Sequence, residues 1–373
     1  MGAAGRHSEF LLDYRIEPIN TKPTTLDSTK GAGISMIEIP RLPTILITLL
    51  FILATYVGNA RAQAVNIDAA KKEGSVTFFG TATPSAMEIL NKGFQKKYGI
   101  AVEFWRASAT GVADRALNEW RAERPSFDFI DAPRGVYLIM KKAGLFTKNS
   151  PPSAEKFPAK FKEPDGIGTP WRMLPIGIVY NTELVTAKEA PKSLDDLLMP
   201  KWKGQLAMPD ASSHTTTAQF LWNLQKLKKN KWLDYVKALA KQQPRLVESL
   251  TPVATTVIKG EASVGISLIN IVTQFKGPLA YAPIDQYLTD PSYLSLSAKA
   301  AHPNAARLFI DYLCSNEGQT AFAETGEFVL SPGIYPAIVD AQKVAANVIF
   351  MDNPSEEEFK KLMADFREIF FSK

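Results

Sequence analysis

Residues 75–105 read SVTFFGTATPSAMEILNKGFQKKYGIAVEFW, and this stretch sets the fold class. A β-rich run at 75–80 ends in glycine, and Thr83-Pro84 then opens an apolar helical pattern that continues to Tyr98. A second β-rich run follows at 101–105. Strand, helix and strand in this order predict a parallel sheet with helices on its faces.

The same alternation continues along the chain. The pattern predicts helices at 111–123 and 134–145 on either side of a strand at 127–131. A second series of strands and helices follows beyond residue 200. The runs 169–181 and 292–297 are extended, and the first is punctuated by proline. We expect these two runs to cross between two lobes rather than to belong to one sheet.

Composition narrows the class of protein. The chain has 373 residues, 46% hydrophobic and 22% charged, which is typical of a globular protein long enough for two cores. Its net charge of +5 is spread along the sequence, without a basic run interleaved with aromatics, so nucleic acid is not an expected partner. A single cysteine, Cys314, rules out an intramolecular disulfide. His7, His214 and His302 lie far apart, so we predict no metal site, no cofactor and no local histidine-based catalytic motif.

The first 64 residues have the features of an export signal. Arg41 precedes an apolar run at 42–57, and small residues at 60–64 fit an Ala-x-Ala cleavage pattern. We predict cleavage after Ala64 and a periplasmic mature chain; an uncleaved membrane anchor is the alternative. Because signal peptides begin shortly before their charged residue, a further hypothesis is that translation starts at Met36. N-terminal sequencing of the unprocessed product tests it.

Two long motifs carry a resemblance to a known family. Residues 191–210 read PKSLDDLLMPKWKGQLAMPD, and residues 302–319 read HPNAARLFIDYLCSNEGQ. Both resemble signatures of the type 2 periplasmic solute-binding proteins, in the ferric-ion and organophosphate-binding branch of the extracellular solute-binding family. The similarity extends over residues 65–373.

The resemblance implies a periplasmic-binding-protein-like type II fold of class α/β. In this fold two α/β lobes are joined by two crossing strands, with a ligand cleft between them. It implies lobe 1 at 65–172 and 297–373, and lobe 2 at 173–296. The implied partners are a small solute and an ABC permease in the inner membrane, and the protein is expected to act as a monomer.

The sequence departs from the iron-binding members of that branch. Those proteins use an early histidine, an acidic residue after the third strand and two adjacent tyrosines. The matching positions here hold Ala82, Pro133 and the pair Asn270-Ile271, which cannot supply charged oxygen donors. Direct ferric binding is therefore not expected. Ferric transport through non-tyrosine or synergistic-anion coordination stays open as an alternative.

Hydroxyl-bearing loops before three predicted helices form the expected ligand site. Ligands of open α/β sheets bind beyond the carboxyl ends of strands, and helix N-termini favour anions. Arginines can pair with a carboxylate or phosphonate, although surface arginines and simple helix caps are the competing explanations. The predicted ligand-binding residues are Thr81, Thr83, Ser108, Thr110, Arg134, Arg172, Ser212, Ser213, Thr215 and Asn270.

These observations predict a binding protein rather than an enzyme. The expected ligand is a small anionic solute, such as a carboxylate, phosphonate or phosphate ester, captured for import by an ABC transporter. An exported enzyme is an alternative, but the sequence has no nucleophile elbow, metal cluster or paired-carboxylate motif. A periplasmic sensor that passes its signal to a kinase is a further alternative. The sequence identifies neither the solute nor the permease.

Overall fold

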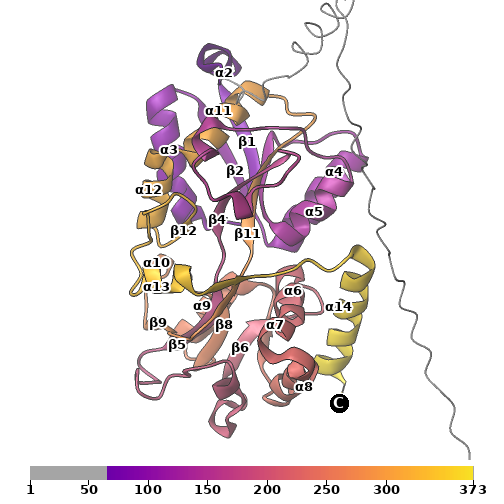
Figure 1. The fold of residues 1–373 in the computed structure, drawn as a ribbon, viewed down its shortest axis with the longest axis vertical. Helices are drawn as coiled ribbons and strands as arrows, with labels where there is room; N and C mark the ends of the chain where they lie inside the picture. The colour runs from indigo at the N-terminus through magenta and orange to yellow at the C-terminus, as the bar shows by residue number, and fades with distance from the viewer. Residues whose placement is uncertain (1–64, 373) are drawn as a thin grey trace, which may run out of the picture. The chain divides into compact units, whose positions relative to one another are not determined.

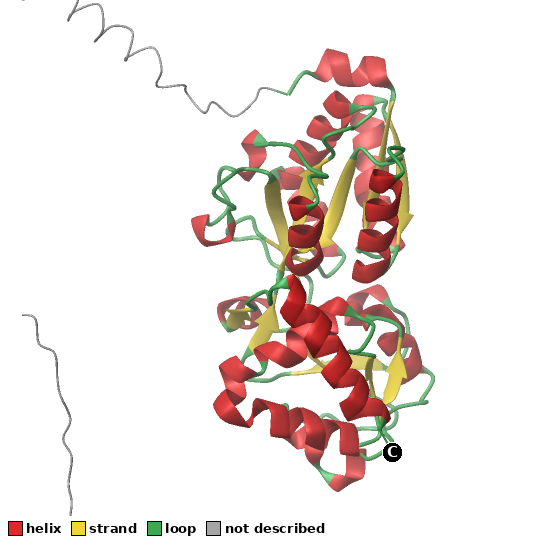
Figure 2. Ribbon diagram, turned by 90° about the vertical axis from the view of Figure 1, so that its right-hand side faces the viewer, coloured by secondary structure: helices red, strands yellow, loops and turns green. Residues whose placement is uncertain are grey.

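The computed structural model describes residues 65–372, shown in Figure 1. The predicted export signal, the cleavage point after Ala64 and the alternative start at Met36 lie outside these residues. The strands of the described part form two sheets, of six and seven strands. Helices flank the strands in both, as Figure 2 shows. We call each sheet with its helices a lobe.

The first lobe contains the six-stranded sheet. Its strand order is β12-β4-β11-β3-β1-β2. Strands β1, β2 and β3 are parallel, as the alternating pattern predicts, whereas β11 runs antiparallel to both β3 and β4. The strands are β1 Ser75–Gly80, β2 Ala101–Arg106, β3 Phe129–Pro133, β4 Gly168–Met173, β11 Pro291–Leu296 and β12 Phe328–Val329. The helices are α2 Ile67–Glu73, α3 Pro84–Tyr98, α4 Ala109–Arg121, α5 Arg134–Lys142, α11 Pro303–Cys314 and α12 Asn316–Glu324, with short 3-10 turns η1 Pro152–Ala154 and η2 Ala159–Phe161.

Local sequence explains why the first β–α–β unit forms. Pro84 occupies the first turn of α3, and Gly99 ends the helix in a left-handed conformation with φ of 71°. The apolar face of α3 is buried, with Leu90 and Phe94 fully inaccessible to solvent. In the sheet, the ring of Phe78 stacks on those of neighbouring strands. The helix is therefore fixed by its caps and by burial of one face.

The second lobe contains the seven-stranded sheet. Its order is β13-β10-β5-β8-β6-β7, and β9 pairs with β5. The strands are β5 Ile176–Asn181, β6 Leu206–Pro209, β7 Arg245–Val247, β8 Val264–Leu268, β9 Leu279–Ala282, β10 Tyr287–Thr289 and β13 Val348–Phe350. The helices are α6 Thr215–Asn223, α7 Gln225–Lys228, α8 Trp232–Lys241, α9 Leu250–Ile258, α10 Ile271–Gln274, α13 Ala341–Ala346 and α14 Glu356–Phe371, with 3-10 turns η3 Asp195–Leu198, η4 Pro200–Trp202 and η5 Lys229–Lys231.

The predicted crossing strands are confirmed. The extended run at 169–181 is divided between β4 and β5, which lie in different sheets and are separated by two residues. The returning run predicted at 292–297 lies in β11 of the first sheet, and the crossing falls just before it, at Asp290 between β10 and β11. The Leu174 N–H donates to the Asp290 carbonyl at 3.0 Å, so the two crossings are bonded to each other. The predicted fold class, two α/β lobes joined by crossing strands, is therefore confirmed.

The C-terminal segment differs from its expected assignment to lobe 1. The chain crosses again after β12, because β13 pairs with β10 of the second sheet. Helix α14 packs against α6 and α8 of the second lobe, as Figure 1 also shows. Within the expected segment 297–373, α11 and α12 lie on the first lobe, but 348–371 belong to the second. The apolar stripe of α14 can be buried against either lobe, so its sequence alone does not decide the choice.

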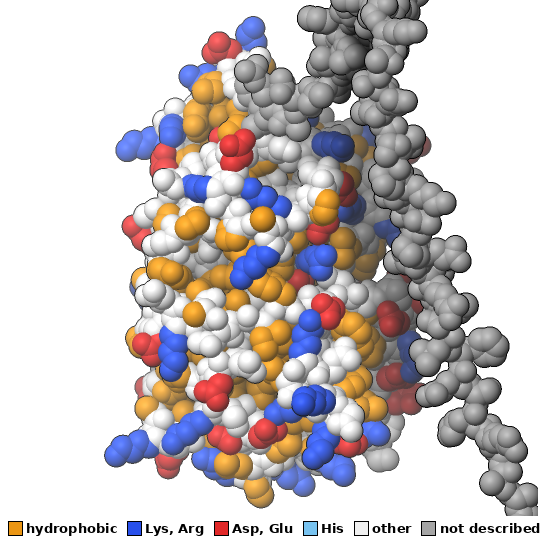
Figure 3. All heavy atoms as spheres, in the orientation of Figure 1, with side chains coloured by type: hydrophobic (Ala, Val, Ile, Leu, Met, Phe, Trp, Pro, Cys, Tyr) orange, Lys and Arg blue, Asp and Glu red, His pale blue; other side chains and the backbone are white. Residues whose placement is uncertain are grey.

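The surface carries charges of both signs. Lysine, arginine, aspartate and glutamate side chains are interspersed over the face drawn in Figure 3. None of the helices in the described residues is both long and apolar enough to pass through a bilayer.

Candidate functional site

A cavity of about 50 Å³ is lined by residues from both lobes. The first lobe contributes the ends of β1, β2, β3 and β4, and the second contributes the starts of α6 and α9. Its lining residues are Thr81, Arg106, Ala107, Ser108, Ala109, Pro133, Arg172, Leu174, His214, Thr216, Ser249, Leu250, Thr251 and Leu268. The cavity therefore lies where parallel strands end, the position at which open α/β sheets bind ligands.

The N-terminal ends of α4, α6 and α9 meet at this cavity. Ser108 caps α4, because its hydroxyl accepts the Gly111 N–H at 3.2 Å. His214 caps α6 in the same way, with its Nδ1 accepting the Thr217 N–H at 3.3 Å. Ser249 precedes α9, and its buried hydroxyl has no hydrogen-bond partner within the described residues. The free N–H groups and dipoles of such helix ends favour negative charge.

His214 contributes to the cavity as a neutral group. Its side chain is 3% exposed, and burial, with a smaller effect from nearby Arg106, lowers its pKa to about 4. The ring is therefore uncharged at neutral pH, and its Nδ1 accepts the capping hydrogen bond.

Arg106 supplies a positive charge to the cavity. It ends β2, and its Nη2 donates to the Thr251 hydroxyl of the second lobe at 2.8 Å. Its Nε has no hydrogen-bond partner in the described part of the chain. Burial lowers the pKa of Arg106, and neighbouring Arg172 lowers it further while Glu248 raises it. An arginine stays protonated at neutral pH despite such a shift, so the cavity keeps a cation whose bound acceptor is a neutral hydroxyl.

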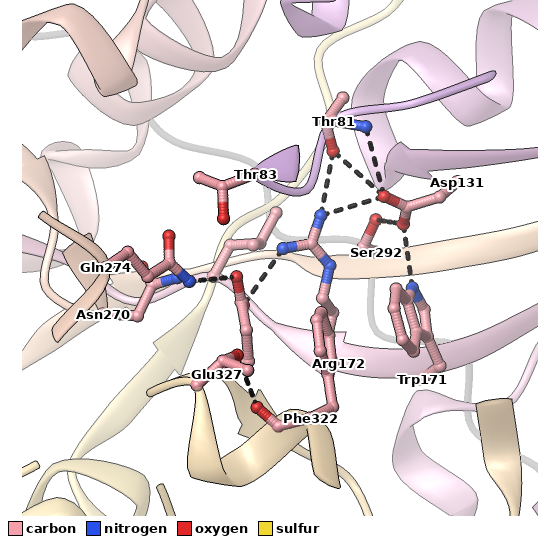
Figure 4. Close-up of polar contacts among 12 residues, drawn as sticks. Thr81, Thr83, Asp131, Trp171, Arg172, Asn270, Gln274, Ser292, Phe322 and Glu327 are labelled. Atoms are coloured by element: carbon pink, nitrogen blue, oxygen red, sulfur yellow. Dashed lines mark hydrogen bonds and ion pairs between the residues drawn. The ribbon is translucent and has the colours of Figure 1, made fainter. Parts of the chain in front are cut away.

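Arg172 lines the same cavity but is engaged by carboxylates, as Figure 4 shows. Its Nη2 donates to Asp131 and to the Thr81 hydroxyl, each at 3.0 Å, and its Nη1 donates to Glu327 at 3.1 Å. Burial lowers the pKa of Arg172, but the carboxylates outweigh it and raise the pKa overall. The two carboxylates more than offset the charge of this guanidinium, which was expected to face a solute anion.

Asp131 is held ionised beneath Arg172. Burial alone would raise its pKa, but Arg172 lowers it, as do hydrogen bonds from Ser292 and Trp171. These donors approach at 2.5 and 2.8 Å, respectively. The carboxylate therefore holds the Nη2 side of the guanidinium, while the Nη1 side is held by Glu327.

Several other predicted residues lie beside the cavity rather than in its wall. Thr83 and Asn270 are both buried, and Figure 4 draws them in the same region of the molecule as Glu327. Thr110 of the first lobe donates to the Ser213 carbonyl at 3.3 Å, and its hydroxyl accepts the Thr215 N–H at 3.4 Å. These contacts join the two lobes at one edge.

Two predicted residues lie elsewhere. Arg134 is 3.4 Å from Glu163 and lines a separate cavity of about 200 Å³ with Asp290. The Ser212 N–H donates to Asp210 at 2.8 Å, within its own loop. Of the predicted set, Thr81, Ser108 and Arg172 line the central cavity, while Thr83, Thr110, Arg134, Ser212, Ser213, Thr215 and Asn270 do not.

The cavity also contains residues outside the predicted set. Arg106 had a detectable signal, because it ends a predicted strand at the edge where ligands bind. His214, Thr216, Ser249 and Thr251 carried weaker signals, since a polar residue before a helix is usually only a cap. Within residues 65–372, no group of three or more His, Cys, Asp or Glu side chains could hold a metal ion.

A family model described as bacterial extracellular solute-binding protein matches residues 134–353, and the chain belongs to this family. The chain is 31% identical over 122 residues to a probable ABC transporter periplasmic-binding protein, y4fP, of Sinorhizobium fredii. That match covers 32% of this chain and 34% of the relative.

Solved structures support the fold. The periplasmic binding protein AfuA from Actinobacillus pleuropneumoniae, with fructose-6-phosphate bound, aligns with a TM-score of 0.65 and 21% identity, covering 80% of this chain and 96% of its own. Iron-bound HitA from Pseudomonas aeruginosa aligns with a TM-score of 0.61 and 19% identity, covering 78% and 99%. At these identities the likeness establishes the two-lobed fold and not the ligand.

Proposed function

We propose that this protein is the periplasmic solute-binding component of an ABC importer and captures a small anionic solute in the cavity around Arg106. The solute class is a carboxylate, a phosphonate or a phosphate ester. The proposal rests above all on Arg106, whose cationic side chain is bound to a neutral hydroxyl and keeps an unpartnered Nε. An anion would complete these hydrogen bonds, and the bonds would be charge-assisted.

The surroundings of Arg106 support the same ligand class. Arg172 is paired with Asp131 and Glu327, and neither carboxylate lines the cavity. Arg106 lines it as a cation whose bonded acceptor is a neutral hydroxyl, with Glu248 as its electrostatic partner. The starts of α4, α6 and α9 add partial positive charge. Hydroxyls of Ser249 and Thr216 offer further donors at the same place. The phosphate ester bound to AfuA belongs to this chemical class.

Ferric iron is less well supported than an anion. The described residues that line the cavity include no aspartate, glutamate or tyrosine, which are the side chains that supply charged oxygen donors to hard cations. The two charged side chains in the lining, Arg106 and Arg172, are both cationic and also disfavour a bare cation. Binding of iron as an anionic complex would still depend on Arg106. Substitution of Arg106 by alanine therefore tests both the anionic solute and the anionic iron complex as ligands.

A thermal-shift screen of the purified mature chain tests the proposal. The probes are inorganic phosphate, methylphosphonate, glycerol 3-phosphate, citrate and ferric citrate, with glucose and choline as neutral and cationic comparisons. A ligand that binds only the folded state raises the melting temperature, so at least one anion should do so. Arg106→Ala should weaken binding of that anion by about tenfold or more, since a hydrogen bond to a charged group contributes on that scale.

Arg121→Ala is the matched control, because Arg121 is an exposed arginine at the end of α4. This variant should bind the anion as the wild type does. Stabilisation by glucose or choline alone would contradict the anionic class. Equal affinity of Arg106→Ala and wild type would contradict the assigned site.

A further inference from the structure

We propose that Glu327 is a positioning residue that couples capture of the solute to closure of the lobes. It does so by binding Arg172 in the cavity wall and Gln274 on the opposite lobe. We call the hydrogen bond between Glu327 and Gln274 the latch. The part of this inference that concerns solute capture rests on the proposed function, whereas the latch is tested separately in solute-free protein.

The two carboxylate oxygens of Glu327 have different partners. Oε2 accepts from Arg172 at 3.1 Å, and Oε1 accepts from the Gln274 side-chain amide at 2.9 Å. Glu327 precedes β12 of the first sheet, whereas Gln274 ends α10 of the second lobe. Figure 4 shows the carboxylate between the two side chains. Glu327 is 1% exposed, so both interactions are shielded from water.

The backbone around Glu327 is shaped for this contact. The Thr273 hydroxyl of α10 donates to the Thr325 carbonyl of the first lobe at 3.0 Å. Gly326 has a φ of 95°, and a Cβ at this position would collide with the Thr273 hydroxyl. The absence of a side chain at Gly326 therefore lets the turn at 325–327 lie directly against α10. We call this contact the α10 seam.

The seam is connected to the cavity through one side chain. The guanidinium of Arg172 lines the cavity, binds Glu327 and has a buried Nε without an acceptor among the described residues. A solute that fixes Arg172 also fixes Glu327 in the position that accepts from Gln274. Separation of the lobes removes Gln274, which frees Glu327 and loosens Arg172. Capture and closure then favour each other, and thermodynamic linkage makes the effect reciprocal.

Substitutions at Gln274 test the latch without changing the cavity wall. Gln274→Ala removes the hydrogen bond, and Gln274→Glu places a carboxylate opposite Glu327. Spin labels at Lys72→Cys in α2 and Glu357→Cys in α14, both exposed positions, report the distance between the lobes. Native Cys314 is fully buried and should stay unlabelled.

In solute-free protein, the open population should increase from wild type to Gln274→Ala to Gln274→Glu. From wild type to Gln274→Ala, the ratio of open to closed protein should rise about tenfold, because the lost hydrogen bond involves a charged acceptor. The open population of Gln274→Glu should fall as the pH is lowered toward 5, because protonation of the introduced carboxyl removes the repulsion between the two side chains. Gln95→Ala, at an exposed glutamine of α3, should match wild type.

A folded Gln274→Glu variant with the wild-type distance distribution at every pH would overturn the latch. Titration with glycerol 3-phosphate and citrate then tests the coupling, and affinity should fall in the same order as the closed population. Unchanged affinity despite an opened distribution would overturn the coupling. If no anion binds the wild type while the solute-free series behaves as expected, the proposed function fails and the latch stands.

Discussion

Asp290 is a buried acidic residue at the crossing between the two lobes, and one of its carboxylate oxygens has no hydrogen-bond partner among the described residues. It is fully buried between β10 and β11, and its Oδ2 accepts from Gly135 N–H at 3.3 Å and from Gln219 at 3.2 Å. Its Oδ1 has no partner in the described chain. Burial raises the pKa of Asp290 to about 7, although Gln219 and Arg134 act in the opposite direction.

This shift predicts a pH dependence of stability. Between the unfolded pKa near 4 and the folded pKa of about 7, the folded protein holds a proton that the unfolded chain has released. The contribution of Asp290 to the free energy of unfolding therefore falls as pH rises through this window. Asp290→Asn should remove that contribution. Its stability relative to wild type should increase between pH 5 and pH 8 by on the order of 2 kcal/mol in urea titrations.

Asp68→Asn is the control for this measurement, because Asp68 is exposed on α2. It should follow the wild-type pH profile. A parallel profile for Asp290→Asn would show that the buried carboxyl finds a compensating partner in the folded state.

At the residue scale, the sequence predicted that Arg172 lies at the site, but it did not predict which side chains Arg172 pairs with. Arg172 was expected near the solute, and it does line the cavity. Its carboxylate partners Asp131 and Glu327 are 41 and 155 positions away in the chain, so no local pattern could reveal that its charge is neutralised. Arg106 is absent from the predicted set for a similar reason, since its bonded acceptor, the Thr251 hydroxyl, is 145 positions away in the chain.

At the element scale, Gly326 and Gly74 make a matched pair. Both have positive φ, but a Cβ on Gly74 meets nothing within 4 Å, whereas one on Gly326 meets Thr273. Alanine at either position should cost about 1 kcal/mol of stability through backbone strain. Gly326→Ala alone should also hold the α10 seam apart, and its radius of gyration from X-ray scattering should exceed that of Gly74→Ala. Equal radii would mean that closure does not require this seam.

Capping at the start of α14 gives a second test at this scale. The Ser355 hydroxyl accepts the Glu358 N–H at 3.2 Å, and the Glu358 carboxylate accepts the Ser355 N–H at 2.8 Å. Ser355→Ala should lower the free energy of unfolding by about 1 kcal/mol in urea titrations. Ser372→Ala, at the exposed C-terminal end of the same helix, is the control. Equal stability of the two variants would contradict a role for the capping box.

Local chemistry predicted most elements, with small errors at their ends. The helix expected at 111–123 spans Ala109–Arg121, because Ser108 caps it two residues earlier than the apolar pattern suggested. The following strand is Phe129–Pro133 rather than 127–131, since its pairing with β1 and β11 sets its limits. Element boundaries depend on caps and partners, which periodicity does not contain.

At the scale of the whole molecule, the lobes are joined more extensively than the predicted pair of strands. The chain also crosses after β12, and one continuous hydrophobic cluster includes Phe78 of the first sheet and Ile266 of the second. We therefore expect the lobes to unfold together. Calorimetry should give one transition, with equal calorimetric and van't Hoff enthalpies. Two resolved transitions would show that the lobes are independent.

The placement of 348–371 was the main error in the predicted domain layout. Chain order suggested that a segment returning to lobe 1 would stay there, and α11 and α12 do. The amphipathic face of α14 is complementary to α6 and α8, which only the folded second lobe presents. Fold class follows from alternating patterns, whereas the final docking of a helix follows from three-dimensional fit.

The position of α14 makes the protein suited to use as a genetically encoded sensor. Helix α2 is fixed to the first lobe by α11, and α14 is fixed to the second, so the two ends of residues 65–372 belong to different lobes. Donor and acceptor fluorescent proteins fused to these ends would each be carried by one lobe. Their energy transfer would follow the import cycle in living cells, without any insertion inside the chain.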